Sequence, residues 1–296
     1  MQPLSGMLVV DLSRYLPGAF ASRELLELGA RVVCIEPPGG DPLRSTAPAW
    51  DAALRAGKES LELDLKRDPE PALDLLREAD VVLESFRPGV ASRLGVGPEH
   101  VPERTVYCSI TGFGLGGRDE QRAGHDLNYL GWAGALWDTA PALPPVPIAD
   151  FAAGALGAVT KILAALLERD RTGRGAHVVV SMTHGSHRLV AHRLGGDTVP
   201  RMLTGGLASY RIYETADGRH LTVAPLEPVF FRRLTELVGR PELAERQFDA
   251  DQEALAAELA SIFAKRPLAD WLELFDSEDV CVGPVATIAE AATDLA

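Results

Sequence analysis

The chain has 296 residues, of which 46% are hydrophobic and 24% charged, a length that suits one large domain and a smaller one. Its formal net charge is −13 and it has no long Lys/Arg cluster, which argues against nucleic acid or an anionic membrane surface as a partner. The cysteines show no metal-ligand spacing, so we expect no metal site and free, buried thiols in a reducing compartment: Cys34, Cys108 and Cys281.

The N-terminal segment predicts a strand–helix–strand unit. Residues Met7–Ser13 read as a buried strand, residues 19–30 as an amphipathic helix, and Arg31–Glu36 as a second strand. Such a unit implies parallel strands joined by a right-handed crossover. The first residues lack the charged start and long apolar core of a secretory signal, so we expect a cytoplasmic protein.

The same alternation continues along the chain. Further strands are predicted over 60–65, 80–85 and 105–111, and a helix over 68–79. This order predicts an α/β fold with a doubly wound, Rossmann-like sheet in the large domain. The turn after the first strand has one glycine rather than G-x-G-x-x-G, which argues against NAD or FAD as a cofactor.

From residue 205 the pattern changes. The stretch SYRIYETADGRHLTVAPLE predicts a hairpin around the turn ADG, and three amphipathic helical stretches follow it. We therefore predict a large α/β domain over 1–204 and a smaller α+β domain over 205–296. The most apolar helical stretch, residues 154–170, contains Lys161 and is too short to span a bilayer, so we expect no membrane contact.

The glycine run GFGLGG at 112–117 follows a predicted strand. It lacks the Gly-Lys-Ser/Thr ending of a phosphate-binding loop, so the sequence favours a mobile loop beside an active site.

Three places carry acid–base side chains in apolar surroundings: the pair His125-Asp126, Asp150 and Glu227. Each has a simpler interpretation. His125 could be an ordinary surface residue, Asp150 could cap a helix that begins near Phe151, and Glu227 could sit at a helix start. Adjacent residues of a helix do not face each other, so His125 and Asp126 would have to act on something other than one another.

The motifs around these residues match the pattern of a known family. The stretches RAGHDLNYLGWAG, IADFAAGALGAVTKILAALLERDRTGRGAHVVVSM and MLTGGLASYRIYETADGRHLTVAPLEPVFF resemble the family III CoA-transferases, the CaiB/BaiF superfamily. Within that superfamily the sequence is most similar to the α-methylacyl-CoA racemases. The stretches LSGMLVVDLSRYLPGAFASRELLELGARVV, EPPGGDPLR and ESFRPGV fit the same pattern, so the resemblance covers nearly the whole chain.

The resemblance implies a racemase that inverts the α-carbon of a 2-methyl-branched acyl-CoA by 1,1-proton transfer through an enolate. Such a reaction needs two acid–base groups on opposite sides of the α-carbon. The family pattern assigns these roles to His125 and Asp150, with Glu227 assisting from the small domain, either of the same chain or of a partner subunit. The backbone N–H groups of the GHDLNY turn would hold the enolate oxygen. Coenzyme A enters as part of the substrate, and no separate cofactor is implied.

Two alternatives remain open. In the transferases of the superfamily the aspartate matching Asp126 attacks an acyl-CoA and forms a mixed anhydride, which would make this chain a CoA-transferase. Those enzymes usually lack a histidine before it, so His125 favours proton transfer. The third alternative is a non-catalytic relative that binds an acyl carrier or a partner. A chain free to lose catalysis would have no chemical reason to keep His125, Asp150 and Glu227 together.

The resemblance also implies basic residues that hold CoA and an interlocked homodimer. Arg87 is the best match for CoA binding, with Lys58, Arg44 and Tyr129 as further candidates. In the strand 31–36 the family commonly has a basic residue where this chain has Cys34. We therefore expect one contact to the adenine end of CoA to be missing.

Overall fold

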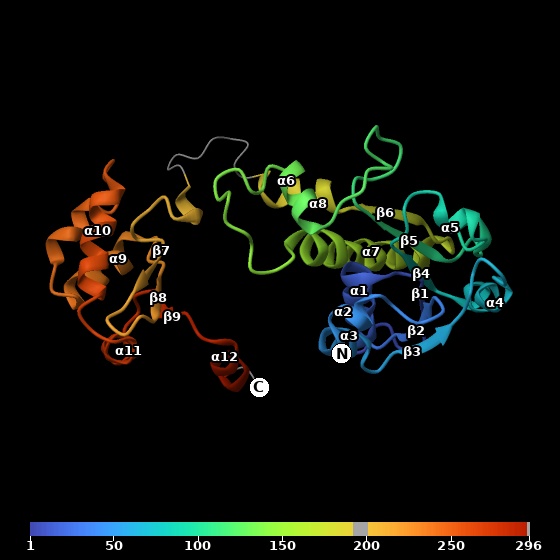
Figure 1. Ribbon diagram of the computed structural model, residues 1–296, viewed down its shortest axis with the longest axis horizontal. Helices are drawn as coiled ribbons and strands as arrows, with labels where there is room; N and C mark the ends of the chain where they lie inside the picture. Colours follow the sequence, from blue (N-terminus) through green and yellow to red (C-terminus); the bar gives the residue numbers. More distant parts are fainter. Residues whose placement is uncertain (192–200, 295–296) are drawn as a thin grey trace. The chain divides into compact units, whose positions relative to one another are not determined.

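The structure is a computed structural model that describes residues 1–191 and 201–294. Contacts between Cα atoms divide the chain into two compact units, Met1–Ala191 and His192–Ala296 (Figure 1). The predicted domain boundary lies after residue 204, whereas this division lies after residue 191. Of the segment 192–204 between the two boundaries, the structure describes only residues 201–204. Each unit has a hydrophobic core of its own, so each is described separately.

The first unit is built on a six-stranded sheet in the order β3-β2-β1-β4-β5-β6. All neighbouring strands are parallel, which confirms the predicted doubly wound α/β fold. The central strands β1, β4 and β5 are buried along their whole length, as parallel strands covered on both faces must be. The strands are β1 Leu8–Asp11, β2 Arg31–Glu36, β3 Glu59–Glu62, β4 Val81–Glu84, β5 Val106–Thr111 and β6 His177–Ser181.

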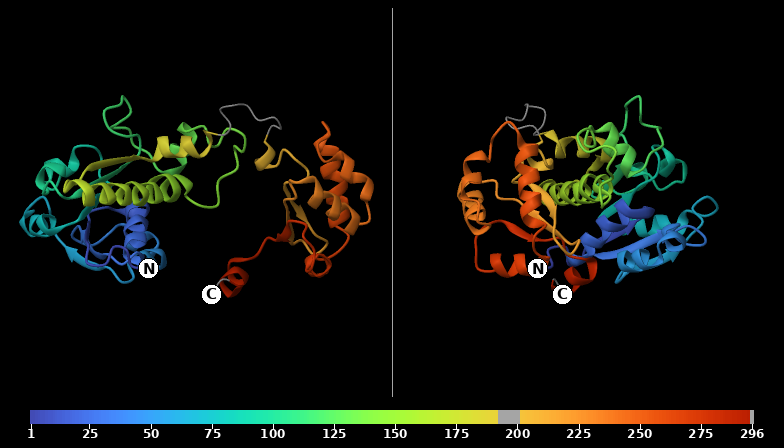
Figure 2. Two further views of the ribbon diagram at one scale, coloured as in Figure 1. Left: turned by 180° about the vertical axis from the view of Figure 1, so that it is seen from behind. Right: turned by 60° about the vertical axis from the view of Figure 1, so that its left-hand side comes forward.

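Helices cover both faces of this sheet (Figures 1 and 2). On one face α1 and α7 pack against alternate strand residues such as Val9 and Val32. On the other face α4 and α5 pack against the residues between them, such as Val10 and Val33. The helices of this unit are α1 Tyr15–Glu27, α2 Leu43–Thr46, α3 Pro48–Arg55, α4 Glu70–Glu78, α5 Val90–Arg93, α6 Asp126–Trp132, α7 Gly157–Thr172 and α8 Met182–Leu189, with the 3₁₀ turn η1 Pro98–His100 and the π-helix η2 Ala149–Leu156.

One detail of the first unit differs from the prediction. Helix α1 begins at Tyr15 rather than near Ala19, because Pro17 falls in the first turn, where a missing N–H costs nothing. The edge strand β6 lies half exposed beside β5.

The helix that contains Lys161 is longer than predicted. The π-helical turn η2 runs directly into α7, and together Ala149–Thr172 form a 24-residue helix, within which an 18-residue window has a mean hydropathy of 1.6. The prediction that this segment is too short for a bilayer was wrong, since by length and composition alone it could cross one. Its residues Ile162 and Leu166 belong to the core on the sheet, and 39% of the apolar window is buried.

The second unit has a three-stranded antiparallel sheet in the order β7-β8-β9 with helices packed around its core. The predicted hairpin is confirmed as β7 and β8, and the three predicted helices are confirmed as α9, α10 and α11; the third strand β9 was not predicted. The elements are the 3₁₀ turn η4 Met202–Thr204, β7 Arg211–Glu214, β8 His220–Val223, α9 Pro228–Leu237, the 3₁₀ turn η5 Pro241–Arg246, α10 Gln252–Phe263, α11 Leu268–Phe275, β9 Val282–Pro284 and α12 Ile288–Asp294.

Candidate active site

A pocket of about 310 Å³ lies at the carboxyl ends of the parallel strands of the first unit. The segments that follow β1, β4, β5 and β6 all contribute to its walls, together with the start of α6 and the first turn of η2. Strands β1 and β4 are neighbours in the sheet although β2 and β3 lie between them in the chain, so the strand order reverses here. Ligands of open α/β sheets bind at such a reversal point.

His125 lies in this pocket at the N-cap of α6. Its backbone N–H donates to Asn128 Oδ1 at 3.0 Å, and its carbonyl accepts from the N–H of Asn128 at 2.8 Å. These bonds fix the backbone of the first turn and leave the imidazole exposed at the pocket wall. The Gly-His-Asp stretch is thus a helix start that presents its histidine to a cavity.

The glycine of this stretch has a packing role that the sequence reasoning missed. A Cβ at Gly124 would lie 2.7 Å from Tyr129 Cε1, and one at Gly112 would lie 2.6 Å from the same atom. The Tyr129 ring therefore packs directly on two bare backbone segments, and its hydroxyl donates to the Gly124 carbonyl. Tyr129 lines the pocket, but its hydroxyl is already used to hold the loop before His125.

Asp150 lines the same pocket from the first turn of η2. The N-cap of this helix is Ile148, so the interpretation of Asp150 as an N-cap was wrong. Burial raises the pKa of the Asp150 carboxyl to about 7, with a smaller contribution from the negative charge of Asp126. A carboxyl with a pKa near neutrality can both accept and donate a proton, which is the property a general acid–base residue needs.

Asp126 is not among the residues that line the pocket. Its Oδ1 accepts a hydrogen bond from the backbone N–H of Asp150 at 2.9 Å. The carboxylate thus satisfies one N–H at the start of η2 and places a negative charge at the positive end of the continuous helix Ala149–Thr172. In this arrangement Asp126 ties α6 to η2 and so fixes His125 and Asp150 relative to each other.

The predicted CoA-binding residues separate into two groups. Arg87 follows β4 and lines the pocket, and it forms no ion pair within residues 1–191 and 201–294. Arg44 instead forms ion pairs with Glu36 at 2.9 Å and with Asp51 at 3.3 Å. The Nζ of Lys58 donates to the Ala19 carbonyl at 2.7 Å, and burial lowers the pKa of Lys58. Arg44 and Lys58 do not line the pocket.

Cys34 is buried on β2, with its Sγ 3.9 Å from Asp11 Oδ2. Burial raises the pKa of this thiol to about 12, and the Asp11 charge adds to the shift, so the side chain stays neutral at physiological pH. Cys34, Cys108 and Cys281 are free cysteines, as predicted; Cys34 and Cys108 are buried, but the prediction of a buried thiol was wrong for Cys281, which is exposed.

Glu227 lies in the second unit, directly before α9. Its carbonyl accepts from the N–H of Phe230 at 3.1 Å and from that of Phe231 at 3.2 Å, which confirms that it sits at a helix start. Its side chain is exposed and forms no side-chain cap.

Three further residues line the pocket and were not singled out from the sequence: Arg14, Tyr15 and Arg122. Tyr15 has a φ of +63°, rare outside glycine, and its N–H donates to Asp41 Oδ2 at 3.0 Å. The signal that could have found Arg14 and Tyr15 is their place directly after the first parallel strand, where the loops of such sheets carry ligands.

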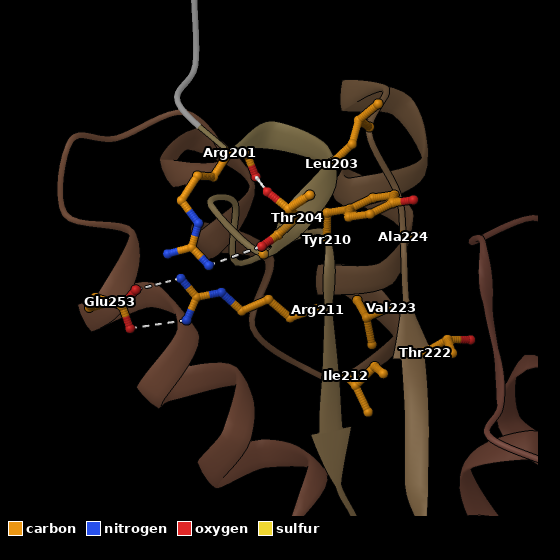
Figure 3. A pocket seen from close by; sticks show the side chains of 11 residues that line it. Arg201, Leu203, Thr204, Tyr210, Arg211, Ile212, Thr222, Val223, Ala224 and Glu253 are labelled. Atoms are coloured by element: carbon orange, nitrogen blue, oxygen red, sulfur yellow. Dashed lines mark hydrogen bonds and ion pairs between the residues drawn. The ribbon is translucent and has the colours of Figure 1, made fainter. Parts of the chain in front are cut away.

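A larger cavity of about 640 Å³ lies in the second unit, beside β7 and β8 (Figure 3). Two of its charged side chains, Arg211 and Glu253, form a two-point ion pair, and the third, Arg201, donates to the Thr204 carbonyl. Hydrogen bonding to Arg211 lowers the pKa of Glu253, which makes this carboxylate a poor proton acceptor. The smaller pocket with His125 and Asp150 is therefore the better candidate for acid–base chemistry.

Comparisons with known proteins identify the family of this chain. The family model of CoA-transferase family III matches residues 4–295. The human alpha-methylacyl-CoA racemase is 36% identical over 97% of this chain and 78% of its own length, and the acetyl-CoA:oxalate CoA-transferase of Acetobacter aceti is 33% identical over 98% and 82%. The crystal structure of a CAIB/BAIF family protein from Brucella suis matches with a TM-score of 0.83 at 30% identity, over 99% of this chain and 86% of that one. The chain belongs to CoA-transferase family III.

Proposed function

We propose that this protein is an acyl-CoA racemase that inverts the carbon next to the thioester of a 2-methyl-branched acyl-CoA. The observation that carries the proposal is the placement of the three acid–base side chains. His125 and Asp150 line one pocket, whereas Asp126 is absent from its lining and is bonded to the Asp150 N–H. A CoA-transferase would need the Asp126 carboxylate free to attack a thioester.

The reaction then uses both members of the pair, one to remove a proton and the other to supply a different one. Asp150 as carboxylate removes the α-proton from one enantiomer while protonated His125 returns a proton to the opposite face, and the roles reverse in the other direction. The pKa of about 7 at Asp150 suits both roles near neutral pH. The enolate formed between the two steps carries its charge on the thioester oxygen, and the unpaired N–H groups at the start of α6 are suitable donors for it.

The proposal also includes the predicted CoA-binding residue, the role of Glu227 and the homodimer. Arg87 would bind a phosphate of the CoA portion, and CoA would be present only as part of the substrate. Glu227 would assist the reaction from the second unit of the same chain or of a partner subunit in a homodimer. The racemases of human and mouse, at 36% identity each, support the choice of a 2-methylacyl group.

The test is incubation of one enantiomer of a 2-methylacyl-CoA with the protein, with and without an added carboxylic acid. Products are separated by chiral chromatography and identified by mass spectrometry. We expect the second enantiomer to form at the same rate whether or not the acid is present. Formation of a new acyl-CoA that depends on the added acid would instead identify a CoA-transferase. If the added enantiomer stays unchanged with and without the acid, the result would support a non-catalytic relative.

A further inference from the structure

A buried carboxylate lies directly before the loop that carries Arg87. Glu84 is the last residue of β4 and is 5% exposed. The loop that follows it, between β4 and α5 (Figure 1), lines the candidate active site with Ser85, Phe86 and Arg87. No cation forms an ion pair with Glu84 within residues 1–191 and 201–294. A buried charge without a counter-ion is costly, so this carboxylate depends on its hydrogen bonds.

The main hydrogen-bond partner of Glu84 is the backbone of the loop itself. Its Oε2 accepts the N–H of Phe86 at 2.6 Å. The turn continues with a bond from the Val90 N–H to the Arg87 carbonyl at 3.0 Å, and Phe86 packs against the core on the α4 and α5 face of the sheet. The carboxylate therefore holds the chain where it leaves the sheet, one residue before Arg87.

The groups that surround the Glu84 carboxylate carry little charge. Strand β1 and helix α5 contribute the apolar Leu12 and Ala91 to the core on this face. On β5, Ser109 pairs with Glu84 in the strand register and hydrogen-bonds to its carboxylate. The Ser109 Oγ also lies 3.0 Å from Nε2 of His177 on β6. Burial lowers the pKa of His177, so its imidazole is neutral at pH 7 and is no counter-ion.

The other titratable groups nearby supply no positive charge either. Tyr107 and Cys108 on β5 stay neutral, because burial raises the pKa of both side chains. Glu99 in η1 is a second acid, and its charge acts on Tyr107 and His177. Among the described residues, the charge of Glu84 is therefore stabilised by hydrogen-bond donors and not by a cation.

The charge of Glu84 changes near neutral pH. Burial raises its pKa to about 7, and hydrogen bonds from Ser109 and from the Phe86 N–H oppose this rise. A hydrogen bond to an ionised acceptor is shorter and about twice as strong as one to a neutral acceptor. Protonation of Glu84 therefore weakens the bond that holds the loop before Arg87.

We propose, building on the CoA-binding role proposed for Arg87, that Glu84 is a positioning residue for CoA: its ionised carboxylate holds loop 85–87 in the conformation in which Arg87 binds a phosphate. Glu84 acts through the loop, since it is buried and is not among the residues that line the pocket. CoA then binds more tightly to the protein with charged Glu84. By linkage, CoA binding lowers the pKa of Glu84 and releases protons.

The experiment is isothermal titration calorimetry of the full-length protein with free CoA at several values from pH 6 to pH 8.5. Glu84→Gln removes the charge and keeps an oxygen that can accept the Phe86 N–H. We expect the variant to bind CoA about threefold to tenfold more weakly than the wild type at pH 8.5, and nearly as well at pH 6. The CoA phosphates and Asp150 also titrate, but they do so in both proteins, so the comparison isolates Glu84.

Proton release gives a second readout that a merely structural role would not change. Titrations at pH 7 in buffers of different ionisation enthalpy measure the protons released for each CoA bound. We expect the wild type to release more protons than Glu84→Gln. Ser109→Ala removes a hydroxyl that stabilises the charged carboxylate, so it should move the midpoint of the pH dependence upward.

Glu62→Gln is the matched control. Glu62 is the last residue of the edge strand β3, as Glu84 is the last residue of β4, but it is exposed and lies outside the pocket. This variant should keep the wild-type Kd at every pH. The stoichiometry of each titration reports the fraction of folded protein, so partial unfolding of a variant does not distort its Kd.

The outcomes separate this inference from the proposed function. Equal pH dependence of the Kd in the wild type and Glu84→Gln, or proton uptake in place of release, would overturn the role of Glu84 and leave the racemase standing. A loss of affinity in Glu84→Gln that is the same at pH 6 and pH 8.5 would show a structural role alone and would also overturn it. Absence of CoA binding by the wild type and by Glu62→Gln at every pH would contradict the CoA-binding role of Arg87 itself.

Discussion

One hydrogen bond connects the residues on which the proposed chemistry depends. Asp126 follows His125 in the sequence, and its carboxylate holds the N–H of Asp150 at 2.9 Å. The bond brings two distant segments together and places a negative charge beside Asp150, which helps to raise the pKa of that carboxyl. Asp126 therefore acts as a positioning residue, whereas His125 and Asp150 would touch the substrate.

Removal of either acid–base group should stop racemisation without unfolding the protein. We expect His125→Ala and Asp150→Asn each to lower the rate of α-proton exchange by about 10²–10⁴-fold, the usual contribution of one positioned acid or base. Circular dichroism and thermal unfolding control for the fold. Exchange at the wild-type rate in both variants would rule out the two-base mechanism.

Substitution of Asp126 separates the two main functional alternatives. In a racemase Asp126→Asn keeps an oxygen that can accept the Asp150 N–H, so we expect a smaller loss of exchange than in His125→Ala. Loss of the charge should also shift the pKa of Asp150 downward, because the Asp126 charge contributes to its raised value. The pH profile of exchange measures this shift. Complete loss of activity in Asp126→Asn, with His125→Ala still active, would favour the anhydride mechanism.

The raised pKa of Asp150 also affects stability. The folded pKa of about 7 lies above the ordinary aspartate value of 3.8, so the folded state binds more protons between these values. We expect the free energy of unfolding of the wild type, relative to Asp150→Asn, to be highest below about pH 4 and to fall as the pH rises to about 7. Denaturant titrations of both proteins at pH 4, 5.5 and 7 measure the difference. A difference that does not change with pH would place the Asp150 pKa near its ordinary value.

At the scale of elements, the start of α6 depends on the close contact between Tyr129 and the backbone of Gly124. A Cβ at position 124 would meet the ring at 2.7 Å, so we expect Gly124→Ala to cost about 1–3 kcal/mol and to displace His125. Gly131, within α6 itself, has open space at its Cβ position. Gly131→Ala is the matched control and should stabilise the helix by about 0.5–1 kcal/mol. Equal stability changes in the two variants, measured by chemical denaturation, would contradict this account of the glycine.

Most elements of the fold could be predicted from the sequence, because buried strands such as Arg31–Glu36 and the hairpin at 211–223 carry strong local patterns. The three-residue strand Val282–Pro284 lacks such a pattern. The π-helical turn at Ala149–Leu156 also escaped prediction, and with it the true place of Asp150. The contact between Asp126 and the Asp150 N–H joins residues 24 positions apart, which no local pattern encodes.

At the scale of the whole molecule, the two units have separate hydrophobic cores. Ile162 is fully buried in the first unit and Leu259 in the second. We expect Ile162→Ala and Leu259→Ala each to cost about 2–5 kcal/mol and to lower the midpoints of different calorimetric transitions, since separate cores can unfold separately. A single transition that both variants lower equally would show that the units unfold together.

The chemistry predicted from the sequence is distributed over both units. His125, Asp150 and Arg87 meet in a pocket of the first unit, whereas Glu227 belongs to the second. Arg44 and Lys58 were CoA-binding candidates implied by the family resemblance, but each is held by partners on the protein. The sequence shows which residues are charged, but only the folded structure shows which of them already bind other groups of the protein.

The most direct test of the central claim is proton NMR of the protein with a 2-methylacyl-CoA in D₂O and no added acid. Our account predicts that the α-proton signal disappears and that the adjacent methyl doublet collapses, while the acyl group stays on CoA. It also predicts that His125→Ala and Asp150→Asn abolish this change. An α-proton that persists while added carboxylic acids are converted to CoA thioesters would contradict the account and identify a transferase.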